Sequence, residues 1–134
     1  MTADVRARFL AGIAAQLPAD RVKEVHLFGA IRQGGAESGV AVVAVEREEP
    51  IALDVDGSVV PPARYIVYTA RYRHTLKGAD RGKWELSVKE EADAPLLTVD
   101  AVVRGVSRRS GDADETVRLS GDEFRTALLE PARA

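Results

Sequence analysis

The chain has 134 residues, of which 46% are hydrophobic and 30% charged, and its net charge is −2. This composition excludes a disordered chain, and the length fits one domain, residues 1–134, with one hydrophobic core. The small net charge excludes a global field that would draw the protein to nucleic acid or an anionic membrane, and the lack of cysteine excludes disulfides and thiolate-bound zinc. No apolar run reaches the roughly 20 residues that span a bilayer. Charged residues between Asp4 and Arg8 interrupt any signal-peptide core, so we expect a cytoplasmic protein.

A helix is predicted near each end of the chain. In the first, Thr2 is a suitable cap, Pro18 ends the run, and apolar side chains recur every four residues, at Val5, Phe9, Ile13 and Leu17. A second, short helix is predicted to begin directly after Ser120. Ser120 and Glu123 have the spacing of a capping box. We interpret the apolar stripes of both helices as parts of the hydrophobic core.

Strand-like segments fill the chain between these helices, and they are rich in β-branched and aromatic residues. The segments are Arg21–Gly29, Gly39–Val45, Ile51–Val55, Ser58–Pro62, Arg64–Leu76, Lys83–Ala92, Leu96–Val106 and Glu115–Leu119. Asp56 and Gly57 separate two of them with the signal of a tight hairpin. We therefore expect an α+β fold with an N-terminal helix, a curved antiparallel sheet of six or seven strands and a short C-terminal helix. A cystatin-like roll is the leading analogy.

The alternation of side chains predicts how the longest segments pair. If Leu76 lies opposite Trp84 and His74 opposite Leu86, the apolar side chains share one face of the sheet and the arginines share the other. The segment Leu96–Val106 is expected to add a third strand to the same apolar face. The helices are then expected on that face.

The segment Gly39–Val45 is apolar at every position after its glycine, so both of its faces need cover. Two amphipathic helices can cover only one side of a sheet of this size. Either the segment is central, with curled sheet or a loop behind it, or a second subunit covers it. We expect a homodimer whose interface, or whose nearest covered sheet face, includes part of Val40–Val45.

The loop Gly29–Ala36 has the glycine spacing of a phosphate-binding P-loop, but it lacks that motif's chemistry. A P-loop needs a lysine, a serine or threonine for magnesium, and a helix that follows. Gly35 and Ala36 occupy the two side-chain positions here, and a strand-like segment follows. We therefore predict no metal and no cofactor, and we assign Gly34, Gly35 and Gly39 to a turn.

Two sets of side chains are candidate sites. Tyr68, Tyr72, His74 and Trp84 would share the apolar face and line a pocket for a small aromatic or apolar ligand, with His74 as a proton-transfer group. The second set consists of basic residues in or near the segment Arg64–Lys83. These anion-binding candidates are Arg32, Arg71, Arg73 and Lys77.

Three hypotheses of function follow from these patterns. The leading one is a small non-enzymatic binding or assembly domain. The alternative is a small-ligand-pocket protein or an enzyme that uses His74. A further alternative is an anion or nucleic-acid binder that uses the basic segment, whose interleaved tyrosines are typical of single-strand nucleic-acid surfaces. Nucleic acid is the less favoured ligand, because acidic segments near residues 48 and 91 can balance the arginines.

Overall fold

The computed structural model describes residues 1–55, 58–91, 99–109 and 115–129, with side chains described for 1–49, 64–91, 99–108 and 116–129. In chain order the elements are α1 (Ala3–Gln16), the short 3₁₀ helix η1 (Ala19–Arg21), β1 (Val22–Gln33), β2 (Ala36–Val55), β3 (Ser58–Thr75), β4 (Trp84–Glu90), α2 (Val99–Arg109), β5 (Glu115–Ser120) and α3 (Gly121–Leu129). The described residues form five strands, which make one antiparallel sheet in the order β4-β3-β2-β1-β5. The predicted α+β fold with a helix at each end is confirmed, whereas the predicted six or seven strands are wrong.

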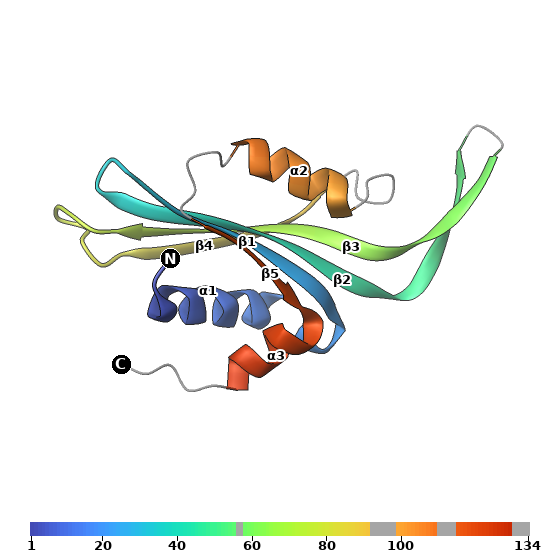
Figure 1. Ribbon diagram of the computed structural model, residues 1–134, viewed down its shortest axis with the longest axis horizontal. Coiled ribbons are helices and arrows are strands. Elements are labelled where there is room, and N and C mark those ends of the chain that lie inside the picture. The colour runs from blue at the N-terminus through green and yellow to red at the C-terminus, as the bar shows by residue number, and fades with distance from the viewer. Residues whose placement is uncertain (56–57, 92–98, 110–114, 130–134) are drawn as a thin grey trace.

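The strand count is lower because neighbouring segments merge and one segment is a helix. Gly39–Val45 and Ile51–Val55 both belong to β2, and Ser58–Pro62 continues into β3. The outer parts of β2 and β3 extend beyond the other strands as a two-stranded ribbon (Figure 1). The segment Leu96–Val106 was predicted as a strand, but from Val99 onward it forms α2, and its first residues lie outside the described part of the chain.

The helices cover both faces of the sheet. Figure 1 shows α1 and α3 below the sheet and α2 above it. We call the two sides the α1 face and the α2 face. The buried residues at the α1 face are Phe9, Leu10, Ile13, Leu17, Val22, Val25, Leu27, Ala41, Val43, Val45, Ala70, Tyr72 and Phe124. Those at the α2 face are Phe28, Val40, Val42, Val67, Val102 and Val106.

The expected cover on both sides of Val40–Val45 is present, but the same chain supplies it. Every residue of this stretch is at most 8% exposed. The valines of α2 pack on one side and the residues of α1 and α3 on the other. The reason that led us to predict a homodimer therefore does not apply, because α2 occupies the face that a second copy was expected to cover. The homodimer itself stays a prediction.

Both predicted helix caps are formed. The Thr2 hydroxyl accepts a hydrogen bond from the Val5 amide at 3.2 Å. At α3 the Ser120 amide donates to the Glu123 carboxylate and the Glu123 amide donates to the Ser120 hydroxyl, each at 3.1 Å. This reciprocal pair is a capping box, and it fixes where the chain leaves β5 and enters α3.

The pairing of β3 with β4 differs from the prediction by two residues. His74 lies opposite Trp84 and Tyr72 opposite Leu86. Leu76 has left the strand pair, because its amide donates to the Gly35 carbonyl of the β1–β2 turn at 2.8 Å. A shift of two residues leaves every side chain on its predicted face, since side chains alternate with a period of two.

No helix in the described part of the chain is long and apolar enough to cross a membrane.

Candidate functional site

Three of the four predicted ligand-pocket residues, Tyr72, His74 and Trp84, come together on the α1 face, where α1 packs on them. The rings of Tyr72 and Trp84 stack with their centroids 4.9 Å apart, and Phe9 of α1 meets Tyr72 edge-on at 4.8 Å. The Arg8 guanidinium lies 4.2 Å from the centre of the Trp84 ring. His74 is 5.8 Å from that ring, and its buried Nδ1 has no hydrogen-bond partner among the described residues. This cluster is packed in the manner of a protein core.

Tyr72 is fixed further by a buried carboxylate. Its hydroxyl donates to Glu37 at 2.9 Å, and the two residues are only 1% and 4% exposed. Burial and this hydrogen bond raise the pKa of Tyr72 well above its ordinary value. Gly39 lies directly beneath the ring, and a Cβ atom there would overlap it. The glycine was expected to serve a turn, but it makes room for the tyrosine.

Tyr68, the fourth predicted pocket residue, lies farther along β3 on the same face. Its side chain packs at the border of the α1-face core, and it is half-buried. Burial, followed by the nearby charge of Glu90, raises its pKa. The structure thus brings Tyr72, His74 and Trp84 together and leaves Tyr68 at a distance along the strand.

The β1–β2 turn accounts for the glycine-rich loop. Gly34 and Gly35 have φ angles of 60° and 76°, a region that side-chain-bearing residues rarely adopt. Arg32 reaches back over the turn, with Nε 3.7 Å from the Glu37 carboxylate. Lys77 passes close to Gly35. These two anion-binding candidates therefore lie at the turn.

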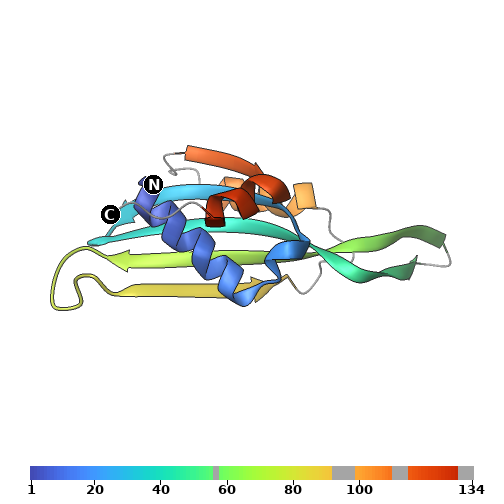
Figure 2. The same ribbon diagram turned by 90° about the horizontal axis from the view of Figure 1, so that it is seen from below.

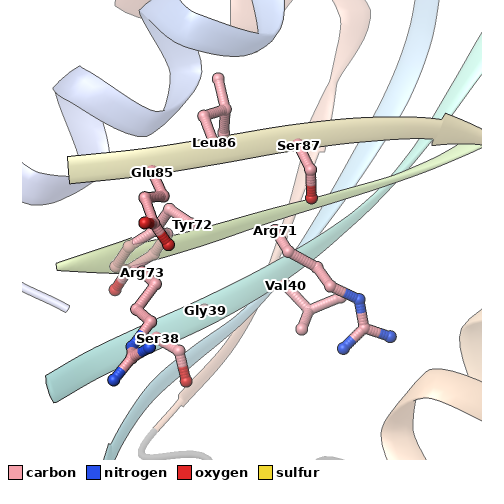
Figure 3. A pocket seen from close by; sticks show the side chains of 9 residues that line it. All are labelled: Ser38, Gly39, Val40, Arg71, Tyr72, Arg73, Glu85, Leu86 and Ser87. Carbon is pink, nitrogen blue, oxygen red and sulfur yellow. The ribbon is translucent and has the colours of Figure 1, made fainter.

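The other two anion-binding candidates line a hollow of about 310 Å³ on the α2 face, where β2, β3 and β4 lie side by side. We call it the Arg71–Arg73 groove. Its lining residues are Ser38, Gly39, Val40, Arg71, Tyr72, Arg73, Glu85, Leu86 and Ser87. Figure 3 shows both arginine side chains on one side of the strands and Leu86 on the other. The side chains of Tyr72 and Leu86 belong to the α1-face core, so these residues reach the groove through their backbone.

The register of three strands builds this groove from two rows of side chains. One row consists of Val40, Arg71 and Ser87, and the next consists of Ser38, Arg73 and Glu85. Because each row crosses the sheet at one level, its side chains share one face. Strand pairing alone thus sets two guanidinium groups beside two hydroxyl groups over an apolar residue.

The charges in the groove are unequal. Arg71 and Arg73 are exposed, and neither has an ion-pair or hydrogen-bond partner among the residues that the structure describes. Glu85 is the acidic residue of the lining, and its carboxylate lies 3.0 Å from the Lys83 ammonium group. The guanidinium groups are consequently available to an anionic ligand, which arginine binds through two parallel hydrogen bonds when geometry allows.

A second hollow, of about 410 Å³, opens at the other end of the sheet, where β1 and β5 meet α3. It is lined by Val22, Lys23, Glu24, Tyr65, Arg118, Ser120, Gly121, Asp122 and Arg125. Its guanidinium groups are already engaged. Arg118 donates twice to Glu24, at 2.8 and 3.1 Å, and Arg125 donates to Asp122 at 2.9 Å and to the Val22 carbonyl at 3.0 Å. We therefore assign these contacts to holding β1, β5 and α3 together.

His26 lies beside this second hollow. Its Nε2 is 3.4 Å from the Glu24 carboxylate, and the side chain is 12% exposed. Nε2 is buried without a hydrogen-bond partner among the described residues. Within that part of the chain, no group of three or more histidine or acidic side chains is arranged to hold a metal ion.

Sequence reasoning found the arginines of the groove but missed Ser38, Val40, Glu85 and Ser87. A signal was present for two of them, because Glu85 and Ser87 alternate with partly buried residues along β4. The lining residues of β2 join the arginines only through the pairing of β2 with β3, and no pattern in the sequence predicted that pairing. Comparison of the chain with protein-family models, with curated proteins and with solved structures finds no match.

Proposed function

We propose that this protein is a non-enzymatic binding domain that holds a small anionic ligand in the Arg71–Arg73 groove. The observation that carries the proposal is the pair of guanidinium groups with no acidic partner among the described residues. In the second hollow the equivalent groups are neutralised by Glu24 and Asp122. The arginines of the groove are therefore available to an external anion, whereas those of the second hollow are not.

The chemistry of the lining favours a compact ligand with more than one polar group. Arginine side chains two positions apart on a strand project from the same face at a spacing of roughly 6–7 Å. Two carboxylates of one small molecule can span that distance, and two guanidinium groups that converge from it can share the oxygens of one phosphate ester. The hydroxyl groups of Ser38 and Ser87 are further donors, and Val40 offers an apolar surface between them. A volume of about 310 Å³ is at the lower end for small-molecule sites.

The proposal is tested by titrating the protein with phosphate, succinate and citrate, using calorimetry and thermal unfolding. Ligand at ten times its Kd stabilises the folded state by about 1.4 kcal/mol, which raises the Tm of a chain of this size by roughly 3–6 °C. The variant with Arg71→Gln and Arg73→Gln should lose this shift.

A matched control removes the same charge elsewhere. Lys77→Gln with Arg81→Gln changes two exposed cations of the β3–β4 hairpin that do not line the groove. This variant should keep the ligand-induced shift. Equal binding by the Arg71/Arg73 variant and the unaltered protein, or no response to any of these anions, would refute the proposal.

A further inference from the structure

The outer edge of β4 has backbone groups that point away from the sheet. The Glu91 amide donates to the Val67 carbonyl at 2.9 Å, and the Thr75 amide donates to the Lys83 carbonyl at 2.9 Å. In an antiparallel pair such bonds involve alternate residues. The odd-numbered residues of β4 therefore bond to β3, and the even-numbered residues direct their amides and carbonyls to the outer edge, where the described part of the chain places no further strand. These residues are Trp84, Leu86, Val88 and Glu90.

We propose that two copies of this chain pair antiparallel through β4, with the two-fold axis at Ser87. In this register Glu85 lies opposite the partner's Lys89, and Leu86 lies opposite the partner's Val88. Lys83, just before the strand, lies opposite the partner's Glu91. The two-fold axis repeats each of these contacts, so every charged residue named here lies opposite a residue of opposite sign.

The charges select this register over its neighbours. A two-fold axis at Leu86 would place Lys83 opposite the partner's Lys89, and one at Val88 would place Glu85 opposite the partner's Glu91. Each alternative sets like charges against each other twice, which is unfavourable. Charged residues usually keep edge strands from pairing. In β4 their order makes the edge complementary to a second copy of itself.

The geometry of the strand supports the same register. The even-numbered residues, whose backbone groups point outward, form the hydrogen-bonded pairs, and about eight interchain backbone hydrogen bonds result. Glu85 and the partner's Lys89 fall at a non-hydrogen-bonded pair, where side chains approach most closely. The side chains of Lys83 and Glu85 are 57% and 52% exposed, so they can change partners with little rearrangement.

The α1 helix, which packs on β4, leaves room for a partner. Figure 2 shows α1 crossing the strands obliquely and ending over β4. Gly12 rests directly on Leu86, which brings the helix close to the strand. The exposed residues on the helix turns next to this contact are Arg8, Ala11, Ala15 and Gln16. Ala11 and Ala15 are small, and the long side chains of Arg8 and Gln16 would have to turn aside where the α1 helices of the two copies approach each other.

The dimer also changes the groove, a consequence that rests on the proposed function. Ser87 and Glu85 line the groove at the edge where the partner would add its strand. The partner's Lys89 would then neutralise Glu85, while Arg71 and Arg73 keep their charge. The two grooves would meet at Ser87, so that the pair of copies presents one basic surface with four arginines. Anion binding is accordingly expected to be tighter in the dimer.

The dimer is tested without any ligand by a cysteine placed on the two-fold axis. The chain contains no cysteine, so Ser87→Cys introduces a single thiol. A non-hydrogen-bonded pair has a Cα separation of about 4.5 Å, within the range of a disulfide. This variant should form a covalent dimer quickly under mild oxidation at tens of micromolar. Thr116→Cys, an exposed position on the opposite edge strand β5, is the control and should react far more slowly.

Charge reversal tests the register. Glu85→Lys or Lys89→Glu alone sets like charges opposite each other twice and should raise the dimer Kd by about tenfold or more. Mixing the two variants should restore association, because each then supplies the charge that the other needs. Equal oxidation rates at Ser87→Cys and Thr116→Cys, or no recovery on mixing, would overturn the proposal. If the protein is strictly monomeric and still binds anions, the result would support the proposed function and contradict only the proposed dimer.

Discussion

Removing one hydroxyl group at the buried contact between Tyr72 and Glu37 should destabilise the fold measurably. The Tyr72 hydroxyl donates to Glu37 at 2.9 Å, and both side chains are almost fully buried. Tyr72→Phe keeps the ring between Phe9 and Trp84 and deletes only the donor. A hydrogen bond to a charged group contributes about 1.5–3 kcal/mol, and a buried acceptor left without its donor is costly, so we expect a loss of about 2–3 kcal/mol.

Urea unfolding of the two proteins measures this loss. The midpoint should fall while the slope with denaturant stays the same, because the surface exposed on unfolding is unchanged. Tyr65→Phe, at a half-buried tyrosine of the same strand, is the control and should change stability by less than about 1 kcal/mol. A Tyr72→Phe variant within about 0.5 kcal/mol of the unaltered protein would refute the account of this contact.

The same contact predicts how stability depends on pH. The pKa of Tyr72 is raised above its unfolded value of 10.0, so the folded state holds the phenolic proton more tightly. The stabilisation from this group is fully present below that unfolded pKa and is lost as the pH rises toward the higher folded pKa. The difference in stability between the unaltered protein and Tyr72→Phe should therefore shrink at alkaline pH. A difference that grows with pH would contradict the assignment.

Three further substitutions test other parts of the fold. Val106→Ala, in the small core beneath α2, should cost about 1–3 kcal/mol in urea unfolding, because Val106 is 1% exposed. Gly39→Ala should destabilise by about 1–3 kcal/mol or prevent folding, since its Cβ would overlap the Tyr72 ring. Arg118→Gln should cost less than about 1 kcal/mol, because its guanidinium pairs with Glu24 while 72% exposed. A large loss for Arg118→Gln with little loss for Val106→Ala would reverse our ranking of these contacts.

Local patterns in the sequence predicted much of the fold. Thr2, Ser120 and Glu123 are short-range signals, because a cap is made between residues three positions apart. The faces of β3 and β4 were predicted correctly despite a register error, since an error of two residues does not exchange faces. Where the pattern of a segment fits both a strand and a helix, the sequence did not determine the structure.

The α2 helix shows this limit most clearly. Val99 and Val103 fit an alternating strand, whereas Val99, Val102, Val103 and Val106 fit one face of a helix. Both patterns occur in the same segment, and β-branched valine favours neither strongly enough to decide. The α2 face of the sheet decides, because Phe28, Val40, Val42 and Val67 form an apolar surface that Val102 and Val106 of the helix cover. That surface exists only after β1, β2 and β3 have paired.

The candidate site was harder to predict than the fold because it depends on long-range pairing. The aromatic residues suggested a pocket, but α1 packs on them, and no short-range signal shows which helix will cover which face. Arg71 and Arg73 were singled out by their charge, whereas Ser38 and Ser87 join them only through the register of three strands. A site assembled across strands in this way has no motif in the sequence.

A purely structural explanation also exists for Arg71 and Arg73. The α2 helix covers only part of its sheet face, and arginine side chains can keep the remainder soluble while their stems shield Val40, which is 8% exposed. That role needs charge but no particular neighbours, so lysine at both positions would serve equally well. Ligand binding needs the planar guanidinium groups, which lysine does not provide. The variant with Arg71→Lys and Arg73→Lys should therefore keep the solubility and stability of the protein and lose most of its affinity for a dicarboxylate or phosphate. Unchanged affinity of this variant for these anions would show that the groove acts only as a charged surface.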